Sequence, residues 1–404
     1  MVDIRKIESK DLLLDLGLQP VSNRFLKNKS DTCPKFPFKV VISRETGLIS
    51  LNKTFPIKEI RPRYDWITYS EPEEHLDTVV DMIVRLPGIS ERSVVGSFSF
   101  KDNSTLERLR KIGFKNLWNI NPRQDLGIKN EKCSVETFQS RFNMEKANKL
   151  ANKYGLADIV IVRHVLEHAY NIGNFINSIK KLIKKEGYIV WEIPDCEKSL
   201  KKLDYTMFWE EHVYYFTEFT LKQLLKSYNF KIINFSSFNN FRENSLVAIV
   251  KFEKDFFYKK DKYFNKKLKK EILQAKFFAR SLTAQRKKIK KKIFQFRGKF
   301  PNSNVAIYGA GHLTVAFISI MQLANLISFV IDDNSYKQNM IMPIGNIPIV
   351  NSKELCKGNI KLCLSSLNPE TQSKIISKNK DFINKGGVFL SIFPTSNFYV
   401  KTLI

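Results

Sequence analysis

The sequence predicts an α/β protein with a small N-terminal domain and two larger domains that each contain a parallel sheet flanked by helices. Three observations support this fold class. Runs rich in Val and Ile alternate with helix-like runs over residues 81–253, as strands and helices alternate in such folds. The glycine-rich segment 309–314 directly follows an apolar run, and a Lys-rich segment separates the two regions. The length of 404 residues also exceeds that of most single domains.

These patterns divide the chain into four segments. The segments are a small N-terminal domain (1–80), a first α/β domain (81–253), a basic helical linker (254–300) and a C-terminal Rossmann-like domain (301–404). In the N-terminal domain we expect strands at 38–42 and 48–51, separated by the turn Thr46-Gly47.

The first α/β domain contains six expected strands and four expected helices. The strands are expected at 93–98, 117–121, 158–162, 187–194, 231–235 and 245–252. The helices are expected at 105–112, 146–153, 174–182 and 220–228. This order favours a sheet with helices packed on its faces.

The positive charge of the chain is concentrated in the linker. The chain has a net charge of +27, and residues 259–299 hold 17 Lys and Arg against two acidic residues. No nucleic-acid motif accompanies this charge, and charge alone gives only sequence-independent attraction. We therefore expect no nucleic-acid partner. Apolar residues at helical spacing predict one long amphipathic helix or a broken pair of helices. The basic face of this segment is either a solvated linker surface or a surface that docks on anionic groups, such as bilayer lipid or a nucleotide diphosphate.

Cysteine usage and hydropathy indicate a cytoplasmic protein. The five cysteines form no CxxC pair, so neither a zinc ribbon nor a disulfide framework is predicted. No apolar run approaches the ~20 residues needed to span a bilayer, and no signal-like segment follows Met1.

The segment 209–216 is the leading candidate for chemistry. It places Glu211-His212 between Trp209 and Tyr215. A histidine has an ordinary pKa of ~6.5 and is well suited to move a proton near neutral pH. The alternative is that His212 merely packs in an aromatic cluster.

Further candidates follow two expected strands of the first α/β domain. Arg163 and His164 end one strand, at the carboxyl edge where ligands bind in open α/β sheets. Glu192 lies at the end of the next strand, where burying it unpaired would be costly. His168 is either a fourth candidate or a histidine that caps or packs at a helix start.

The segment 309–314 has the context of a dinucleotide-binding fingerprint. Gly309 and Gly311 follow a strand and open a helix, and Asp332 comes about twenty residues later. The third position of the fingerprint holds Thr314 rather than Gly or Ala. Taken alone, this pattern leaves NAD-dependent chemistry open as a weaker alternative.

Four phrases of the sequence resemble one family. They are 16–25 (Leu-Gly-Leu-Gln-Pro-Val-Ser-Asn-Arg-Phe), 163–168 (Arg-His-Val-Leu-Glu-His), 187–195 and 209–216. Together they resemble the three-domain S-adenosylmethionine-dependent sugar C-methyltransferases. The resemblance implies a methyltransferase core whose last strand is antiparallel, S-adenosylmethionine as cofactor and a nucleotide-linked sugar as substrate. The pathway would make a surface polysaccharide or a glycosylated metabolite.

The resemblance also implies catalytic roles. His212 would take the proton from a carbon next to a sugar keto group, and the enediolate would attack the methyl group. Glu211 would orient His212 or its neighbour, and Tyr215 would hydrogen-bond the oxyanion. Trp209 replaces a tyrosine of the family.

Cofactor residues are implied around a loop that differs from the family pattern. Phe100 and Ser104 occupy glycine positions of that loop, and Asn121 stands where the family has the acid that binds the ribose. The implied cofactor-binding residues are Phe98, Lys101, Asp102, Asn121, Arg163, His164 and His168.

The sugar site and the missing zinc site complete the resemblance. Residues 242–245 replace a His-Gly-Gly-Ser phrase, and the unit around Gly309 is thought to help hold the nucleotide-sugar in relatives. The implied substrate-binding residues are Glu192, Trp209, Arg242, Asn244, Gly309, Gly311 and His312. Ser43 and Thr46 replace a zinc-binding Cys pair, so no zinc is expected there. The main alternative function is a non-catalytic nucleotide-sugar binder or partner protein derived from a methyltransferase.

Overall fold

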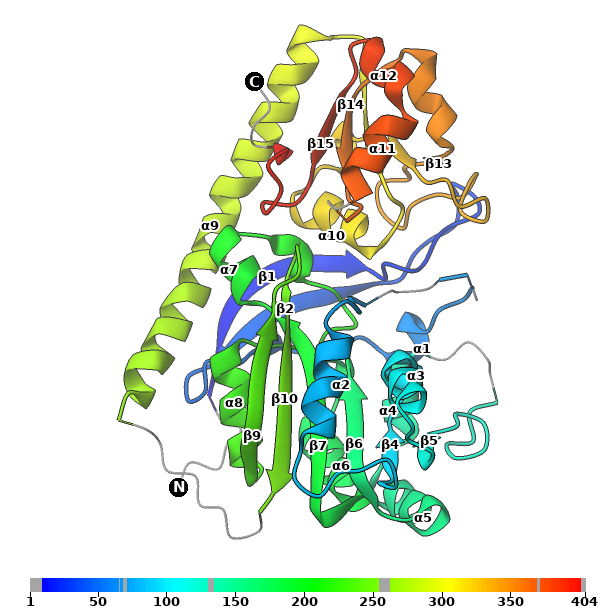
Figure 1. Ribbon diagram of the computed structural model, residues 1–404. Helices are drawn as coiled ribbons and strands as arrows, with labels where there is room; N and C mark the ends of the chain where they lie inside the picture. The colour runs from blue at the N-terminus through cyan, green and yellow to red at the C-terminus, as the bar shows by residue number, and fades with distance from the viewer. Residues whose placement is uncertain are drawn as a thin grey trace. The chain divides into compact units, whose positions relative to one another are not determined.

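Figure 1 shows the computed structural model of the chain. The structure describes residues 9–64, 66–67, 71–129, 134–253, 262–368 and 371–400. Residues 254–261 of the predicted linker and Cys133 lie outside this part of the chain. Within it, no helix combines the length and apolar character needed to cross a membrane.

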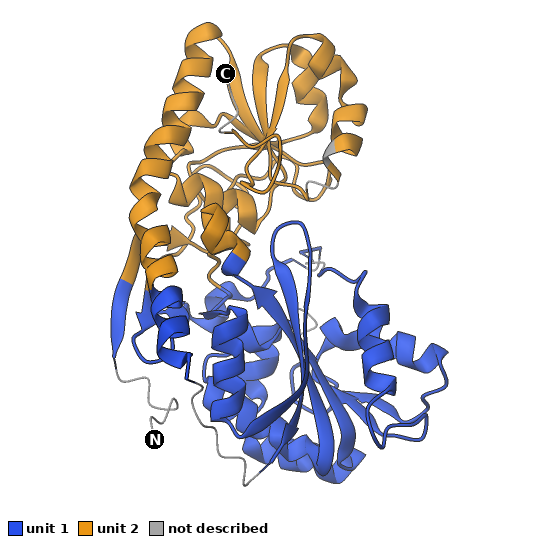
Figure 2. Ribbon diagram, turned by 60° about the vertical axis from the view of Figure 1, so that its left-hand side comes forward, with its two compact units in different colours: residues 1–12, 41–197, 211–272 blue, residues 13–40, 198–210, 273–404 orange. Residues whose placement is uncertain are grey.

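The chain divides into two compact units, which Figure 2 colours separately. One unit contains residues 1–12, 41–197 and 211–272, and the other contains 13–40, 198–210 and 273–404. The units are therefore not consecutive along the chain, and β1 (Lys10–Pro20), β2 (Lys35–Ser43) and α9 (Phe264–Lys299) each contribute to both. The division into consecutive domains at residues 80, 253 and 300 remains a prediction.

The first unit contains a six-stranded sheet in the order β5-β4-β6-β7-β10-β9. Its strands are β4 (Val95–Ser97), β5 (Leu117–Asn119), β6 (Ala157–Arg163), β7 (Ile183–Asp195), β9 (Phe230–Phe238) and β10 (Asn244–Phe252). β4, β5, β6 and β7 are parallel, whereas β10 is antiparallel to both β7 and β9. All six predicted strands are present.

Helices cover both faces of this sheet and form a three-layer α/β/α arrangement. The helices are α2 (Leu76–Val84), α3 (Asn103–Lys111), α4 (Val135–Arg141), α5 (Met144–Tyr154), α6 (Ile172–Ile179) and α8 (Glu218–Ser227). Apolar residues of α2 and α3 pack on one face, and those of α4, α5, α6 and α8 pack on the other. The predicted boundary at residue 80 falls inside α2, whose Val79 and Ile83 pack with the sheet.

Local sequence explains where several of these helices begin. The side chains of Asn143 and Asn171 accept backbone N–H groups at the starts of α5 and α6. Thr217 forms a capping box with Thr220 at the start of α8. Gly96 in β4 lets the Trp118 ring lie against the strand, because a Cβ atom there would be 2.2 Å from that ring.

A four-stranded sheet has the order β1-β2-β3-β8. β3 is Ile49–Leu51 and β8 is Tyr214–Tyr215, so the two predicted N-terminal strands are joined by two that the sequence did not predict. The Ser43 and Thr46 hydroxyls accept the backbone N–H groups of Thr46 and Leu48. These two residues thus tie together the turn between β2 and β3.

The second unit contains a five-stranded parallel sheet in the order β13-β12-β11-β14-β15. Its strands are β11 (Asn304–Tyr308), β12 (Phe329–Ile331), β13 (Ile349–Val350), β14 (Ile360–Ser365) and β15 (Val388–Ser391). The helices α10 (His312–Ile320), α11 (Gln372–Lys378) and α12 (Lys380–Asn384) also belong to this unit. The strand and the helix predicted on either side of the glycine-rich segment 309–314 are therefore present as β11 and α10.

The predicted basic segment forms one helix rather than a broken pair. α9 runs without interruption through 36 residues, along the left of Figure 1. One side of it is buried through Ala275, Phe278, Leu282, Ile289 and Ile293. The short helices α1 (Ile57–Ile60) and α7 (Glu197–Lys202) and several 3₁₀ turns complete the described fold.

Candidate active site

The carboxyl ends of β6 and β7 carry the predicted charged residues. β6 ends at Arg163, and His164 follows with a φ of 49°, in the left-handed region that non-glycine residues seldom adopt. Such strained residues cluster at functional sites, where the surrounding contacts must hold them. Here the His164 backbone N–H donates to the Glu192 carbonyl across the two strands, at 2.8 Å.

Arg163 and Glu192 form a fully buried ion pair. The distance from Arg163 Nε to Glu192 Oε2 is 2.6 Å, and Arg163 also donates to the Lys101 carbonyl at 2.7 Å. His75 Nε2 lies 2.8 Å from the other Glu192 oxygen. Burial raises the pKa of Glu192, but contacts with His164, His75 and Arg163 outweigh this effect and hold it well below its ordinary value. Both charges are thus compensated within the core.

His164 lies among three carboxylates. Its Nδ1 is 3.6 Å from Glu71 and 3.5 Å from Glu167, and its Nε2 is 3.2 Å from Glu192. Burial opposes the charged imidazole, but the surrounding carboxylates, Glu71 foremost, raise the pKa of His164 to about 10. Glu71 also pairs with Lys101. At neutral pH His164 therefore carries a positive charge.

The raised pKa of His164 predicts that stability declines in alkaline solution. Between pH 6.5 and about 10 the folded chain retains a proton on His164 that the unfolded chain has lost. This contribution to the free energy of unfolding is fully present below pH 6.5 and is lost as the pH rises through about 10. Urea unfolding at pH 7 to 10 should show this decline, and His164→Gln should reduce its slope. An unchanged slope in the variant would contradict the assignment.

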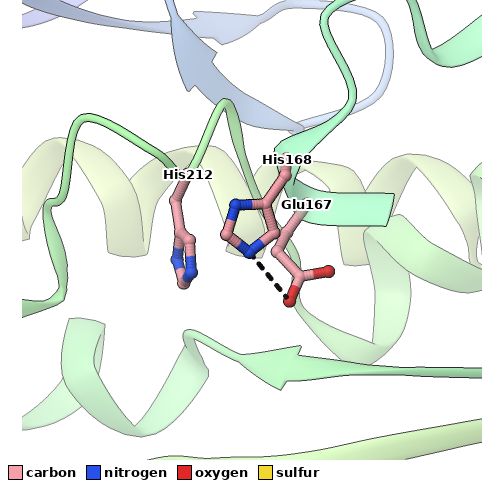
Figure 3. A group of neighbouring side chains, drawn as sticks. All are labelled: Glu167, His168 and His212. Carbon is pink, nitrogen blue, oxygen red and sulfur yellow. Dashed lines mark ion pairs between the residues drawn. The ribbon is translucent and has the colours of Figure 1, made fainter. Parts of the chain in front are cut away.

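His168 and His212 lie together beside the end of β6 (Figure 3). Their ring centroids are 4.7 Å apart with an interplanar angle of 87°. The Val213 backbone fixes this approach, because its N–H donates to the Glu167 carbonyl and its own carbonyl accepts from Leu51, both at 2.8 Å. The loop that carries His212 is therefore held between β3 and the 3₁₀ turn η2 (Leu166–His168).

The carboxylates next to His168 are buried. Nδ1 of His168 is 2.6 Å from Glu136 Oε1, and donor atoms of Glu136, His168 and Glu211 all lie within 4.8 Å of one another. Glu211 thus belongs to a group centred on His168, the neighbour of His212. The Tyr215 ring centroid is 6.2 Å from that of His212.

The predicted cofactor loop is closed on itself. The Phe98 side chain is fully buried against Phe142 and Phe175, with ring centroids 5.0 Å from each. The Asp102 carboxylate accepts the backbone N–H groups of Phe98 and Ser99 at 2.9 Å and that of Arg163 at 2.8 Å. Burial raises the pKa of Asp102 to about 7 despite these bonds. Phe98 and Asp102 therefore hold the loop from inside, whereas Phe100 remains 47% exposed.

At the next strand end, Asn119 rather than Asn121 has an available acceptor. The Asn121 side-chain oxygen accepts the N–H groups of Arg123 and Gln124 and so closes its own turn. Asn119 donates to the Ser99 carbonyl and to Asn103, but its buried Oδ1 accepts no hydrogen bond within the described part of the chain. Sequence reasoning missed Asn119 because it placed the strand end two residues too late.

Arg242 and Asn244 lie at the start of β10. Asn244 Nδ2 donates to Asp195 at 3.4 Å, and Arg242 is 3.7 Å from Glu243. Burial raises the pKa of Asp195 to about 6, although hydrogen bonds from the Glu197 backbone and the Asn244 side chain oppose this effect. The two predicted sugar-binding residues thus lie at the carboxyl end of β7, where Asp195 ends that strand.

The remaining candidates belong to the second unit. The Trp209 and His312 rings stack with centroids 4.3 Å apart, and His312 begins α10 directly after Gly311. Asp332 accepts the Ala310 N–H at 2.8 Å and pairs with Lys337 at 3.0 Å. The acid of the predicted fingerprint therefore closes the glycine-rich loop.

Another contact in this unit was not predicted. Glu210 accepts the Ser22 N–H and hydroxyl at 2.6 and 2.9 Å. It connects the phrase 16–25 to the segment that leads into His212. The only sequence signal was its position beside Glu211.

Two parts of the chain match known protein families. Residues 99–234 match the family described as methyltransferase domain, and residues 260–394 match the C-methyltransferase C-terminal domain. The chain is similar to the C-methyltransferase NovU of Streptomyces niveus, with 24% identity over 396 residues that cover 95% of this chain and 92% of that protein.

Two solved structures cover part of the chain. Magnesium protoporphyrin IX methyltransferase from Synechocystis PCC 6803, with bound S-adenosylhomocysteine, is 16% identical over 44% of this chain and 82% of that one, with a TM-score of 0.31. A SAM-dependent methyltransferase from Anabaena variabilis is 13% identical over 44% and 84%, with a TM-score of 0.28. The family matches and the sheet topology confirm the predicted α/β fold class and methyltransferase core.

Proposed function

We propose that this S-adenosylmethionine-dependent methyltransferase transfers its methyl group to a carbon next to the keto group of a nucleotide-linked sugar. The observation that carries the proposal is the position of His212. It is half-buried beside the carboxyl edge of the sheet, with its ring against that of His168. The similarity to a C-methyltransferase along nearly the whole chain supports carbon as the acceptor.

The chemistry of such a transfer requires a base. A carbon next to a keto group becomes nucleophilic when it loses a proton, and a well-placed imidazole can remove that proton at neutral pH. His212 would take this proton, while the Tyr215 hydroxyl would stabilise the oxyanion. The Glu136 and Glu211 carboxylates are buried, and both lie next to His168. We infer that these carboxylates orient His212 through His168.

The residues present fit the cofactor at the ribose end. Asn119 lies at the carboxyl end of β5 with a buried acceptor that no described residue uses, as binding a ribose hydroxyl requires. S-adenosylmethionine supplies an electrophilic methyl group when bound. Lys101 and Arg163 are held in ion pairs with Glu71 and Glu192, so we assign them to shaping the loop.

Asn119→Ala should weaken the binding of S-adenosylmethionine. Loss of one net hydrogen bond corresponds to about a two- to tenfold rise in the dissociation constant. Isothermal titration would measure this rise, with Asn121→Ala as the matched control because the Asn121 oxygen serves its own turn. A larger effect at Asn121 than at Asn119 would contradict the assignment.

We assign the nucleotide part of the substrate to the second unit. The backbone N–H groups at the start of α10 favour a phosphate, and the stacked pair of Trp209 and His312 offers an aromatic surface. Gly309 has a φ of 105°, and a Cβ atom there would be 2.6 Å from the Ser366 hydroxyl. Nicotinamide chemistry has less support, because Asp332 is occupied by Ala310 and Lys337.

The outer side of α9 fits an anionic membrane surface. The helix has fourteen Lys and Arg against one Glu, and Leu273, Phe277 and Phe294 are 57%, 58% and 57% exposed on it. Basic side chains add about 1 kcal/mol each near anionic lipid, and exposed apolar side chains enter the interface. We propose a cytoplasmic protein that makes this peripheral contact.

Vesicle sedimentation would test the membrane contact. The chain should bind vesicles containing phosphatidylserine and be released by high salt, because the attraction is screened. The variant Phe277→Ser/Phe294→Ser should bind more weakly than Thr283→Ser, an exposed control on the same helix. Equal binding to neutral vesicles would contradict the proposal.

A further inference from the structure

Glu167, His168 and His212 converge on one point of the proposed site. One carboxylate oxygen and one ring nitrogen from each histidine lie within 4.8 Å of one another, and Figure 3 shows these atoms facing a common space. The distance from His168 Nε2 to Glu167 Oε1 is 3.9 Å. This is too long for a direct hydrogen bond. We propose that the three side chains form a binding site for a divalent transition-metal ion such as Zn²⁺.

The donor set suits such an ion. Two histidines and one carboxylate bind zinc in enzymes and leave further coordination positions open. With metal–ligand bonds of about 2.0–2.2 Å and tetrahedral angles, two ligand atoms of one ion lie roughly 3.4 Å apart. The separation of 3.9 Å between His168 Nε2 and Glu167 Oε1 is slightly longer than this, and all three ligand atoms lie within 4.8 Å of one another. Small movements of the His168 and His212 side chains would complete the coordination.

Glu136 supplies the support that a metal-binding histidine needs. Metal-bound histidines usually hold a carboxylate or carbonyl with their second ring nitrogen, which fixes the ring. His168 Nδ1 is 2.6 Å from the Glu136 carboxylate, which is fully buried. This pairing leaves Nε2 directed toward Glu167.

The state of Glu167 is a second, independent observation that favours cation binding at this site. Its side chain is 1% exposed, yet neither carboxylate oxygen accepts a hydrogen bond within the part of the chain that the structure describes. The charged His164 forms an ion pair with it at 3.5 Å, which is long for a hydrogen bond, and the same His164 nitrogen also lies 3.6 Å from Glu71. Glu167 is thus only partly compensated by His164, and a bound divalent ion would supply the close contact that a buried carboxylate requires.

The site has a consequence that rests on the proposed function. A histidine nitrogen that binds a metal ion must be deprotonated and cannot accept a proton. Because His212 is both the proposed base and a ligand, occupation of the site would block proton abstraction. Zn²⁺ should therefore inhibit methyl transfer by this enzyme.

Calorimetric titration of the full-length chain with ZnCl₂ tests the site directly. We expect one ion per chain at micromolar concentration, and Glu167→Gln and His168→Gln should each weaken binding at least about tenfold. Binding of Co²⁺ should produce a visible absorption band that these variants lose. His312→Gln is the control, since it removes a histidine outside the site. Circular dichroism of each variant verifies folding, and Zn²⁺ binding unaffected by both site variants would overturn the proposal.

Activity measurements separate this proposal from the function itself. Zn²⁺ should lower the rate of methyl transfer, and a chelator should restore it. Zinc binding by a chain that transfers no methyl group would leave the site intact and refute the proposed function. Methyl transfer that requires the metal would overturn the inhibitory role, and methyl transfer without zinc binding would overturn the site alone.

Discussion

Replacing His212 with Gln should lower the rate of methyl transfer by about 10²–10⁴-fold, the usual contribution of a well-placed general base. The imidazole would be lost, while the loop would remain held by the Val213 backbone bonds to Glu167 and Leu51. The affinity for S-adenosylmethionine should therefore be unchanged. Single-turnover kinetics and isothermal titration measure the two quantities on the same preparation.

Deuterium exchange provides the control for this prediction. In D₂O the unmodified chain should exchange the proton of the sugar carbon next to the keto group, and His212→Gln should not. Tyr215→Phe, which removes only a hydroxyl, should retain slower exchange. Undiminished methyl transfer by His212→Gln would refute the base, and absence of transfer by the unmodified chain would favour the non-catalytic nucleotide-sugar binder.

Replacing Arg163 with Met should lower the free energy of unfolding by about 3–5 kcal/mol, the usual cost of breaking a buried ion pair on one side. Arg163 and Glu192 are each 1% exposed and joined at 2.6 Å. The variant would leave Glu192 with His75 and His164 as its remaining side-chain partners. Urea unfolding measures the loss.

The double variant Arg163→Met/Glu192→Met is the matched control. Removing both charges removes the desolvation penalty as well, so the double variant should be more stable than Arg163→Met alone. The double variant could instead lose as much free energy of unfolding as Arg163→Met and Glu192→Met lose together. In that case the two side chains would have no coupling energy. That result would contradict the description of the sheet edge.

The sequence predicted the elements whose patterns are local. Alternating apolar runs located the six strands of the first sheet, and the fingerprint after β11 located α10. The sequence also predicted that Arg163, His164 and Glu192 lie at one edge of the sheet, because parallel strands have their carboxyl ends at the same edge. The structure brings these three together.

The partners of these residues could not be predicted, because they are distant in the sequence. His75 precedes Glu192 by 117 positions, and Glu71 and Glu136 carry no motif. The ribose site is assigned to Asn119 instead of the predicted Asn121, because β5 ends before the turn that Asn121 closes. Phe98 was assigned to the cofactor, yet its ring fills the core between α4 and α6. Side-chain direction at a loop is decided by packing, which a motif does not record.

The measurement that tests the central claim most directly is carbon NMR of the product formed from a nucleotide-linked keto sugar and S-adenosylmethionine labelled with ¹³C at the methyl group. A methyl carbon bonded to the ring carbon next to the keto group is the predicted result. A methyl carbon bonded to oxygen or nitrogen would contradict proton abstraction from carbon by His212, and with it the proposed reaction.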